Sequence, residues 1–507
     1  MAEHFDVLIV GAGLSGVGAA VHLHERCPDR SYVILEGRPS MGGTWDLFRY
    51  PGIRSDSDMH TLGYRFKPWR NAKAIADGPS ILSYIKETAT EYDVDRHIRY
   101  QHLATSASWS SADALWTVEA TRKDSGATQR FTCNFLYLCS GYYSYRHGHT
   151  PEFPGRARFT GAVVHPQEWP ADLDYRGKRV VVIGSGATAI TLVPAMAEQA
   201  AHVTMLQRSP TYVVSRPSKD VIANFLRRIL PETWAYAITR WKNVTLQQLF
   251  YGRSRSHPHD VKKRLLDMVR KDLPSGYDVE KHFTPTYNPW DQRLCLVTDG
   301  DLFKVISNGS ASVVTDHIDT FTERGIRLKS GQEIEADIIV TATGLDLVVL
   351  GEMQFTVDGA PVNFADHWSY KGMMCSDVPN LVSTFGYINA SWTLRADLIA
   401  EYVCRLLNRM RETGARQVTA RLRPSDHDMP ARPWLSHFSS GYVQRVIHLF
   451  PKQGDRAPWL NPQHYARDKK AFREDALEDG VLAFTNPATS ARTVEAQSPR
   501  RQEALAS

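Results

Sequence analysis

The sequence predicts an α/β protein with two nucleotide-binding domains of the Rossmann type and a helical insertion in the second of them. Three observations predict this fold class. Residues 6–36 and 179–208 both show the order strand, glycine-rich turn, helix, strand. The stretch between them, 141–170, is rich in turn and aromatic residues, as expected of a linker. Residues 218–283 interrupt the α/β alternation with an aromatic, helical pattern.

These boundaries give a discontinuous arrangement. We expect a first domain over 1–140 and 340–485 and a second domain over 150–217 and 284–339, interrupted by the insertion at 218–283. The apolar segment Ile334–Gly344 predicts a strand that returns the chain to the sheet of the first domain. The segment 486–507 has few apolar residues, which predicts a disordered tail.

Composition excludes several classes of protein. The 507 residues carry a net charge of +5, with 60 basic and 55 acidic residues interspersed, which is not the pattern of a nucleic-acid-binding protein. We find neither a signal peptide nor an apolar run of about 18–20 residues, so we expect a cytoplasmic protein. The six cysteines lack C-x-x-C spacing, which predicts neither a metal site nor a redox-active disulfide. The sequence indicates no oligomeric state.

The first nucleotide motif is Gly11-Ala-Gly13-Leu-Ser-Gly16, which follows the apolar strand Val7–Val10. Its glycines permit a tight turn, the close approach of a pyrophosphate and the packing of helix on strand. Phosphates then face the N-terminus of the helix, where N–H groups are free. The next strand, Ser31–Leu35, ends in Glu36, whose carboxylate can accept both ribose hydroxyls. A structural turn is the alternative.

The motif Gly42-Gly43-Thr44-Trp45 indicates that this dinucleotide is FAD, because a second glycine pair followed by a hydroxyl residue recurs in FAD domains. The alternative is a glycine turn beside a core tryptophan. The residues expected to contact FAD are Gly11, Gly13, Ser15, Gly16, Glu36, Gly43, Thr44, Trp45, Asp46 and Leu47.

The second motif is Gly184-Ser-Gly186-Ala-Thr-Ala189, after the strand Arg179–Ile183. The strand His202–Leu206 that follows ends in Gln207-Arg208-Ser209 rather than in an acid. Arg208 can bind a 2′-phosphate through charge-assisted hydrogen bonds, which predicts NADPH rather than NADH. An exposed arginine after a strand is the alternative. The expected NADP contacts are Ile183, Gly184, Ser185, Gly186, Ala187, Thr188, Ala189, Gln207 and Arg208.

The linker contains Phe159-Thr-Gly161-Ala-Val-Val-His165-Pro-Gln-Glu-Trp169-Pro170. It resembles the Baeyer–Villiger monooxygenase fingerprint F-x-G-x-x-x-H-x-x-x-W-P/D at every fixed position. The stretches 42–58, Tyr287–Cys295 and Asn389–Leu394 closely resemble the ethionamide-activating subgroup of that family.

The resemblance implies that NADPH reduces FAD, that O₂ forms a C4a-peroxyflavin, and that this species attacks a ketone to give an ester or lactone. It implies that Arg293 stabilises the peroxyanion and the Criegee oxyanion and that Asp56 orients the guanidinium beside the flavin. It also places Arg54, Ser55 and Asp56 near NADP⁺ and Ala104 near the FAD adenine. His165 is expected to organise the linker rather than to transfer protons. Trp169 is expected to act as a packing anchor. Gln292 stands where many members have lysine.

Three competing interpretations differ in testable features. An N- or S-oxygenating flavin-containing monooxygenase shares both glycine motifs but not the Trp169-Pro170 ending, and sulfides or thioamides can still be side substrates. A pyridine nucleotide–disulfide reductase needs a cysteine pair that the sequence lacks. A binding scaffold without catalysis would not need Arg293 and Asp56.

The insertion suggests two roles for its apolar side chains. They predict an entrance for neutral, hydrophobic substrates beside the cleft, or a surface that rests on an anionic membrane without spanning it. A packed core is the third alternative. The residues concerned are Phe225, Leu226, Ile229, Leu230, Trp234, Tyr236 and Trp241.

Overall fold

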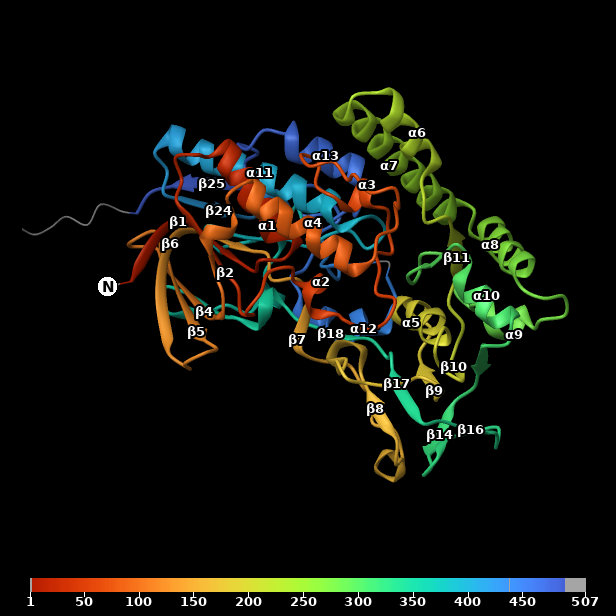
Figure 1. Cartoon of the computed structure of the whole chain (residues 1–507). Helices are drawn as coiled ribbons and strands as arrows, with labels where there is room; N and C mark the ends of the chain where they lie inside the picture. The colour runs from red at the N-terminus through yellow and green to blue at the C-terminus, as the bar shows by residue number, and fades with distance from the viewer. Residues whose placement is uncertain (1, 437, 488–507) are drawn as a thin grey trace, which may run out of the picture.

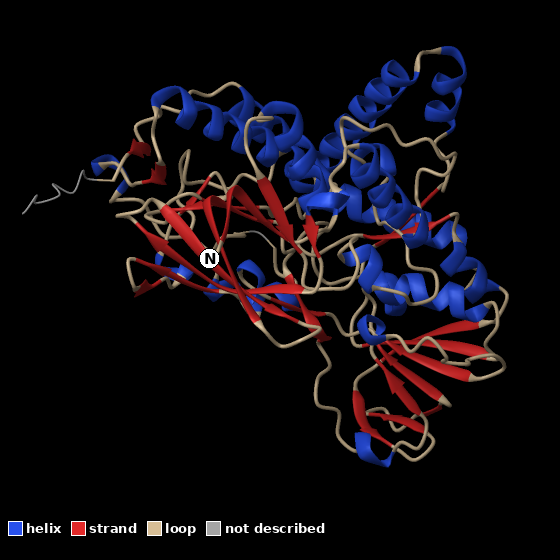
Figure 2. Cartoon of the chain, turned by 60° about the vertical axis from the view of Figure 1, so that its left-hand side comes forward, coloured by secondary structure: helices blue, strands red, loops and turns tan. Residues whose placement is uncertain are grey.

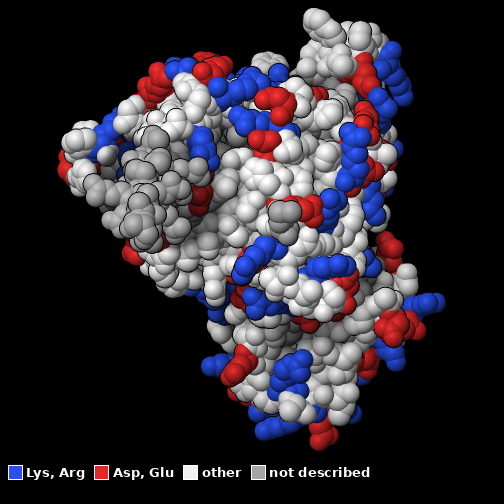
Figure 3. Space-filling view, turned by 90° about the vertical axis from the view of Figure 1, so that its left-hand side faces the viewer, with Lys and Arg blue, Asp and Glu red and all other residues white. Residues whose placement is uncertain are grey.

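The computed structural model of the chain describes residues 2–436 and 438–487 (Figure 1). Two β-sheets lie in separate parts of the molecule, and a group of helices stands beside both (Figures 1 and 2). Of the predicted disordered tail, 486–507, all but Asn486 and Pro487 lies outside the described residues. Acidic and basic side chains are interspersed on the face that Figure 3 shows.

The first sheet has nine strands in the order β20-β19-β4-β5-β6-β1-β2-β3, with β23 also paired to β6. Strand β1 is parallel to β2 and β6, whereas β4, β5 and β6 form an antiparallel meander. Helices α1, α4 and α11 cover one face of this sheet (Figure 1). Their apolar sides are buried against it and form a large hydrophobic cluster with the strands. The elements are β1 (Glu3–Val10), β2 (Tyr32–Leu35), β3 (Ile98–Arg99), β4 (His102–Ser110), β5 (Leu115–Arg122), β6 (Thr128–Leu138), β19 (Gln354–Val357), β20 (Ala360–Pro361), β23 (Leu381–Ser383), α1 (Leu14–Arg26), α4 (Gly78–Glu91) and α11 (Trp392–Thr413).

The second sheet is parallel throughout, in the order β13-β10-β9-β17-β8. The prediction that Ile334–Gly344 joins the first sheet is wrong, because β17 lies between β9 and β8 in the second sheet. An apolar pattern predicts a buried strand but not the strands with which it pairs. The sequence alone therefore did not indicate which sheet β17 joins. The elements are β8 (Ala162–Val164), β9 (Arg179–Ile183), β10 (His202–Gln207), β13 (Ala311–Thr315), β17 (Ile338–Thr341), α5 (Ala187–Ala197) and α10 (Asp301–Ser307).

Two linkers connect the sheets and pair with each other. Strand β7 (Tyr143–Gly148) follows the first sheet, and β18 (Leu345–Leu347) leaves the second, and the two are antiparallel. His165 links the same two passages. Its Nε2 contacts the carbonyl of Gly344 at 3.1 Å, while its Nδ1 accepts the N–H of Gln167 at 3.1 Å. Nδ1 therefore carries no proton, and burial lowers the pKa of the ring.

The segment 218–283 contains four helices, which are α6 (Val221–Ile229), α7 (Glu232–Ser256), α8 (Pro258–Asp272) and α9 (Val279–Phe283). Helix α7 reaches from one domain to the other. Its first half packs on α3 (Met59–Leu62) of the first domain. Helix α8, which packs on α7, contacts β11 (Val213–Arg216) of the second domain.

A buried arginine anchors α7. Arg240 donates to the carbonyls of His60 at 2.9 Å and Gly63 at 2.7 Å, and it pairs with Asp397 at 3.3 Å. Both side chains of this ion pair are at least nine-tenths buried. The insertion is thereby fixed to the first domain, although it leaves the chain within the second.

The other helices and strands are short and lie in loops or two- and three-stranded sheets. They are α2 (Thr44–Leu47), α12 (Gly441–Gln444), α13 (Tyr465–Arg473), β12 (Cys295–Thr298), β14 (Ile318–Phe321), β15 (Gly325–Leu328), β16 (Glu333–Glu335), β21 (Ser369–Tyr370), β22 (Met374–Cys375), β24 (Gln417–Ala420) and β25 (Leu482–Thr485). Within 2–436 and 438–487, every helix is too short or too polar to cross a bilayer.

Arg240→Met is expected to lower the free energy of unfolding by about 3–5 kcal/mol, because it leaves Asp397 buried with one cationic partner fewer. Urea unfolding followed by tryptophan fluorescence measures the loss. Arg253→Met, on the exposed side of the same helix, should change stability by less than about 0.5 kcal/mol. Equal stability of the two variants would show that Arg240 does not anchor α7.

Candidate active site

The first glycine turn connects β1 to α1 at the edge of the first sheet. Gly11 has φ +101°, and a Cβ there would lie 2.6 Å from the carbonyl oxygen of Cys139. A Cβ on Gly16 would lie 1.9 Å from the carbonyl oxygen of Gly11. Neither position admits a side chain, so the turn keeps the N-terminus of α1 directly beside the end of β6.

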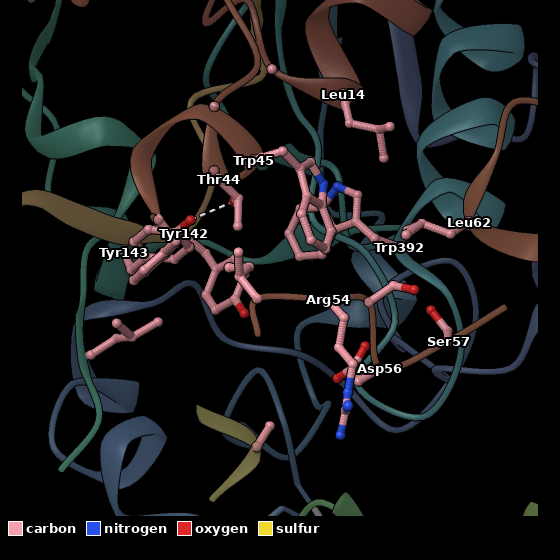
Figure 4. Close-up of a pocket in the computed structure, with 18 of the residues that line it drawn as sticks. Leu14, Thr44, Trp45, Arg54, Asp56, Ser57, Leu62, Tyr142, Tyr143 and Trp392 are labelled. Atoms are coloured by element: carbon pink, nitrogen blue, oxygen red, sulfur yellow. Dashed lines mark hydrogen bonds between the residues drawn. The ribbon is translucent and has the colours of Figure 1, made fainter. Parts of the chain in front are cut away.

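Two cavities meet at this turn. The Glu36 cavity, about 550 Å³, contains Glu36 and Ala104 in its wall. The Arg293 cavity, about 260 Å³, contains Arg293 in its wall together with Trp45 and Asp56, the last two of which are labelled in Figure 4. The two share four residues, which are Gly13, Cys139, Tyr143 and Tyr145. This continuous space along a helix N-terminus suits an extended dinucleotide.

Glu36 is buried at the end of β2, in the wall of the larger cavity. Its carboxylate accepts the N–H of Ala12 at 2.8 Å and the N–H of Arg38 at 2.9 Å. Burial raises the pKa of this carboxyl, and the two N–H donors oppose that shift. Each oxygen retains a lone pair for a further donor such as a ribose hydroxyl.

Aromatic side chains form much of the Arg293 cavity (Figure 4). The hydroxyl of Thr44 is hydrogen-bonded to that of Tyr143. Ser15 accepts the indole N–H of Trp392 at 2.8 Å, and Tyr142 stacks on Trp392 with ring centroids 5.1 Å apart. These contacts fix the positions of two predicted site residues, Ser15 and Thr44.

Asp46 and Leu47 do not line this cavity. Asp46 pairs with Arg38 at 2.5 Å and accepts the Ser40 hydroxyl at 2.6 Å, and it borders an adjoining space of about 780 Å³, whose wall also contains Trp45 and Arg54. Leu47 packs against the hydrophobic core of the second domain. Both residues belong to the short helix α2, and successive side chains of a helix point in different directions.

Arg293 and Asp56 form an ion pair in the wall of the Arg293 cavity, with Nη1 and Oδ2 3.4 Å apart. Arg293 precedes β12 of the second domain, whereas Asp56 belongs to a loop of the first. The Arg293 side chain is 38% exposed and lines the cavity, so it can still receive a ligand. The negative charge of Asp56 raises the pKa of Arg293, which keeps the guanidinium charged.

The neighbours of Asp56 have different environments. Arg54 lines the cavity but forms an ion pair with Asp301, the first residue of α10 in the second domain. Ser55 is buried, and its N–H and hydroxyl are hydrogen-bonded to the backbone of Ala76. Arg54 therefore contacts the second domain through the carboxylate of Asp301.

The second glycine turn repeats the geometry of the first. Gly184 has φ +138°, and a Cβ there would lie 2.3 Å from the carbonyl oxygen of Ala342. A Cβ on Gly186 would meet nothing within 4 Å, so the start of α5 faces open space. Ala187 and Thr188 line the Arg293 cavity, whereas Ile183 and Ala189 are buried. Both glycine turns thus lead to one cavity.

The residues after β10 diverge. Gln207 is buried, and its amide donates to the carbonyl of His282 at 2.7 Å and to Thr315 at 2.9 Å, so its side chain points inward. Arg208 is exposed, and among the described residues no ion pair involves it. The hydroxyl of Ser185 donates to the carbonyl of Ser209 at 3.1 Å beside it.

The structure does not place the apolar side chains of the insertion at the cavities, so the predicted substrate entrance stays a prediction. None of the seven apolar residues named for it lines the Arg293 cavity, the Glu36 cavity or the 780 Å³ space. Tyr236 is buried against the first domain, where its hydroxyl donates to the carbonyl of Tyr64. Trp234 and Trp241 line an open groove on the outer surface. Helical periodicity predicts two faces but does not identify which one meets the cavity.

Sequence reasoning missed the aromatic wall formed by Tyr142, Tyr143, Tyr145 and Trp392. The first three belonged to a stretch interpreted as linker. A usable signal was present, since Cys139-Ser-Gly141 ends an apolar strand with small residues, as Gly11 does. Within the described residues no cluster of His, Cys, Asp or Glu could hold a metal ion, and all six cysteines are buried and unpaired.

Comparison with known proteins identifies the relatives of this chain. The profile of the flavin-binding monooxygenase-like family matches residues 74–350, and that of an NAD(P)-binding Rossmann-like domain matches residues 9–77. FAD-containing monooxygenase EthA of Mycobacterium tuberculosis is 56% identical over 485 residues, covering 96% of this chain and 98% of the relative. EthA of Mycolicibacterium smegmatis is 52% identical over 486 residues, with the same shares covered.

Solved structures show the same fold. Oxidized steroid monooxygenase bound to NADP superposes with a TM-score of 0.76 and 23% identity, over 95% of this chain and all of that one. Cyclohexanone monooxygenase in an open form gives a TM-score of 0.70 and 21% identity, over 84% of this chain and 91% of that one. The predicted fold class, with two Rossmann-like domains, is confirmed.

Arg208→Ala is expected to raise the KM for NADPH about 10- to 100-fold, since a hydrogen bond to a charged group contributes about 1.5–3 kcal/mol. The KM for NADH should hardly change, because NADH has no 2′-phosphate. Steady-state kinetics with both nucleotides measure the difference, and Arg176→Ala, an exposed arginine of the same region, is the control. Equal losses with both nucleotides would remove Arg208 from the 2′-phosphate.

Proposed function

This chain belongs to the flavin-binding monooxygenase-like family, and we propose that it is a Baeyer–Villiger monooxygenase that uses FAD and NADPH. It inserts one oxygen atom of O₂ next to the carbonyl carbon of a hydrophobic ketone, giving an ester or a lactone. The second oxygen atom leaves as water, and NADPH supplies two electrons. The observation that carries this proposal is the Arg293–Asp56 pair in a cavity that both glycine turns reach.

The residues that hold the cofactors follow from the two turns. The free N–H groups at the starts of α1 and α5 would face the phosphates. Glu36 and Ala104, in the wall of the Glu36 cavity, would hold the adenosine half of FAD, and Thr44 and Trp45, in the wall of the Arg293 cavity, would hold its flavin half. Arg208 and the backbone of Gly184–Thr188 would hold NADPH. When bound, the reduced flavin supplies the activated oxygen for transfer to the substrate.

Arg293 provides electrostatic stabilisation at the reacting atoms. Attack on a carbonyl places negative charge on its oxygen, and a preorganised cation stabilises that charge without needing to reorient. Asp56 holds the guanidinium at the cavity wall and keeps it protonated. The aromatic rings of Trp45, Tyr142 and Trp392 exclude water from the same space, which strengthens the electrostatic effect.

The charge balance of the cavity favours neutral substrates. Two cations line the Arg293 cavity, and each has a carboxylate partner, Asp56 for Arg293 and Asp301 for Arg54. A carboxylate substrate would therefore find no free cation in this wall. Ketones with alkyl or aryl chains suit the aromatic lining. Neutral sulfides and thioamides suit it equally, which supports S-oxygenation as a second activity and keeps an N- or S-oxygenating flavin-containing monooxygenase as the alternative.

Arg293→Ala is expected to uncouple the reaction. NADPH should still be oxidised, because hydride transfer does not need this charge, but ester formation should fall about 10²-fold or more. The missing oxygen equivalents should appear as hydrogen peroxide. Parallel assays of NADPH, ester and peroxide test this, with Arg130→Ala, an exposed arginine outside both cavities, as the control. An unchanged ratio of ester to NADPH would contradict the role of Arg293.

A second proposal concerns the outer face of α6 and α7, which form the projecting lobe at the upper right of Figure 1. This face consists of apolar side chains turned away from the first domain. Val221 is 77% exposed, Trp234 68% and Trp241 69%. Soluble proteins rarely expose so many large apolar groups together without a partner. The exposed large apolar residues of α6 and of the first half of α7 are Val221, Ile222, Phe225, Ile229, Trp234, Ile238 and Trp241.

We propose that this face rests on an anionic lipid surface. Arg216, Lys219 and Arg228 are exposed at its edge, and among the described residues no ion pair involves them. Such a basic border around tryptophan and aliphatic side chains is typical of helices that lie in a membrane interface. A second copy of the chain suits the face less well, since two like-charged borders would repel each other.

The double variant Trp234→Ala/Trp241→Ala is expected to lower binding to vesicles of phosphatidylglycerol and phosphatidylcholine at least about tenfold, since each buried side chain contributes about 1.5–3 kcal/mol. Co-sedimentation measures the bound fraction, and Leu449→Ala, an exposed apolar residue elsewhere, is the control. Vesicles of phosphatidylcholine alone should bind the wild type more weakly. Concentration-dependent dimers without vesicle binding would contradict the proposal.

A further inference from the structure

Arg293 is placed by a loop rather than by a helix or a strand. The loop covers 284–294, between α9 and β12. The Arg293–Asp56 contact is 3.4 Å long, longer than a charge-assisted hydrogen bond, so this contact alone does not fix the side chain. The position of Arg293 therefore depends on what holds the loop.

Both ends of the loop are tied to Tyr212 beside β11. The hydroxyl of Tyr212 donates to the carbonyl of Tyr287 at 2.6 Å, and its carbonyl accepts the N–H of Cys295 at 2.9 Å. Between these points the backbone of Trp290 has φ +69°, a strained conformation for a residue with a side chain. Such strain persists only where the surroundings over-determine the backbone.

Asp291, two residues before Arg293, connects three separate parts of the molecule. Its carboxylate accepts the N–H of Asn288 at 3.1 Å, within the loop itself. The other carboxylate oxygen accepts Nη1 of Arg255, on α7, at 2.6 Å. Its carbonyl accepts the N–H of Ser439 at 2.8 Å and the Ser439 hydroxyl at 3.0 Å.

Helix α7 carries these contacts back to the first domain. Tyr251, one turn before Arg255, packs edge-on against Trp290 with ring centroids 5.6 Å apart. The first half of the same helix is anchored by Arg240 to Asp397 and to the backbone of the first domain. Since Asp56 also belongs to the first domain, α7 and Asp291 set the distance between Asp56 and Arg293.

We propose that the ion pair between Asp291 and Arg255 positions Arg293 opposite Asp56, so that both are positioning residues for oxygen transfer. This inference rests on the proposed function of Arg293. Neither side chain lines the Arg293 cavity, so neither touches substrate or cofactor there. Their effect passes through the loop, and a displacement of about 1 Å at a reacting group can cost up to 10²-fold in rate.

The test measures ester formed per NADPH oxidised, the kcat for ester and the KM for NADPH in the full-length holoenzyme. Asp291→Asn and Arg255→Ala should each lower kcat and coupling about tenfold while leaving the KM for NADPH and the FAD content unchanged. Arg255→Lys should retain most of the coupling. Arg253→Ala, on the same helix but paired with Asp260, should behave as wild type.

A double-mutant cycle identifies the route of the effect. Adding Asp291→Asn to Arg293→Ala should cause no further loss, because both changes remove the same charge from its place. Wild-type coupling in both Asp291→Asn and Arg255→Ala would overturn the proposal, as would a full further loss in the double variant. Normal ester formation by Arg293→Ala would instead contradict the proposed function.

Discussion

The structure depends on keeping a positive charge in the wall of an aromatic cavity while leaving it able to bind a ligand there. The ion pair between Arg293 and Asp56 meets this constraint. The two residues come from different domains, so their separation is a property of the whole fold. A carboxylate at 3.4 Å compensates for desolvation but leaves the Arg293 side chain 38% exposed. The paired linker strands β7 and β18, the His165 contact with Gly344, and the α7 anchor all act on the relative position of the domains.

The two glycine turns solve the same problem by the same local means. At Gly11 and Gly184 a Cβ would collide with a neighbouring strand, so the start of each helix can approach the sheet edge closely. Each helix start then presents free N–H groups toward a space that accepts phosphate. Because Ala187 and Thr188 line the cavity that also contains Trp45, the two nucleotide motifs converge on one reaction space.

Local features were predictable, whereas long-range ones were not. The turns at Gly11 and Gly184 and the strands before them follow from backbone sterics within a few residues. The sheet that receives β17 depends on neighbours distant in sequence, and this prediction failed. The faces of α7 were visible as a pattern, yet the pattern gave no sign that Tyr236 points inward and Trp234 outward. The partner of Arg54, Asp301, lies almost 250 residues away in the chain.

We propose that one atom of O₂ enters the substrate at a site built around Arg293. Incubation of the holoenzyme with NADPH, a 2-alkanone and ¹⁸O₂, followed by mass spectrometry of the product, tests this oxygen transfer. We expect an ester that carries a single ¹⁸O atom next to the former carbonyl carbon, and ordinary oxygen in the carbonyl. Unchanged ketone, with one labelled hydrogen peroxide formed for each NADPH oxidised, would contradict this proposal.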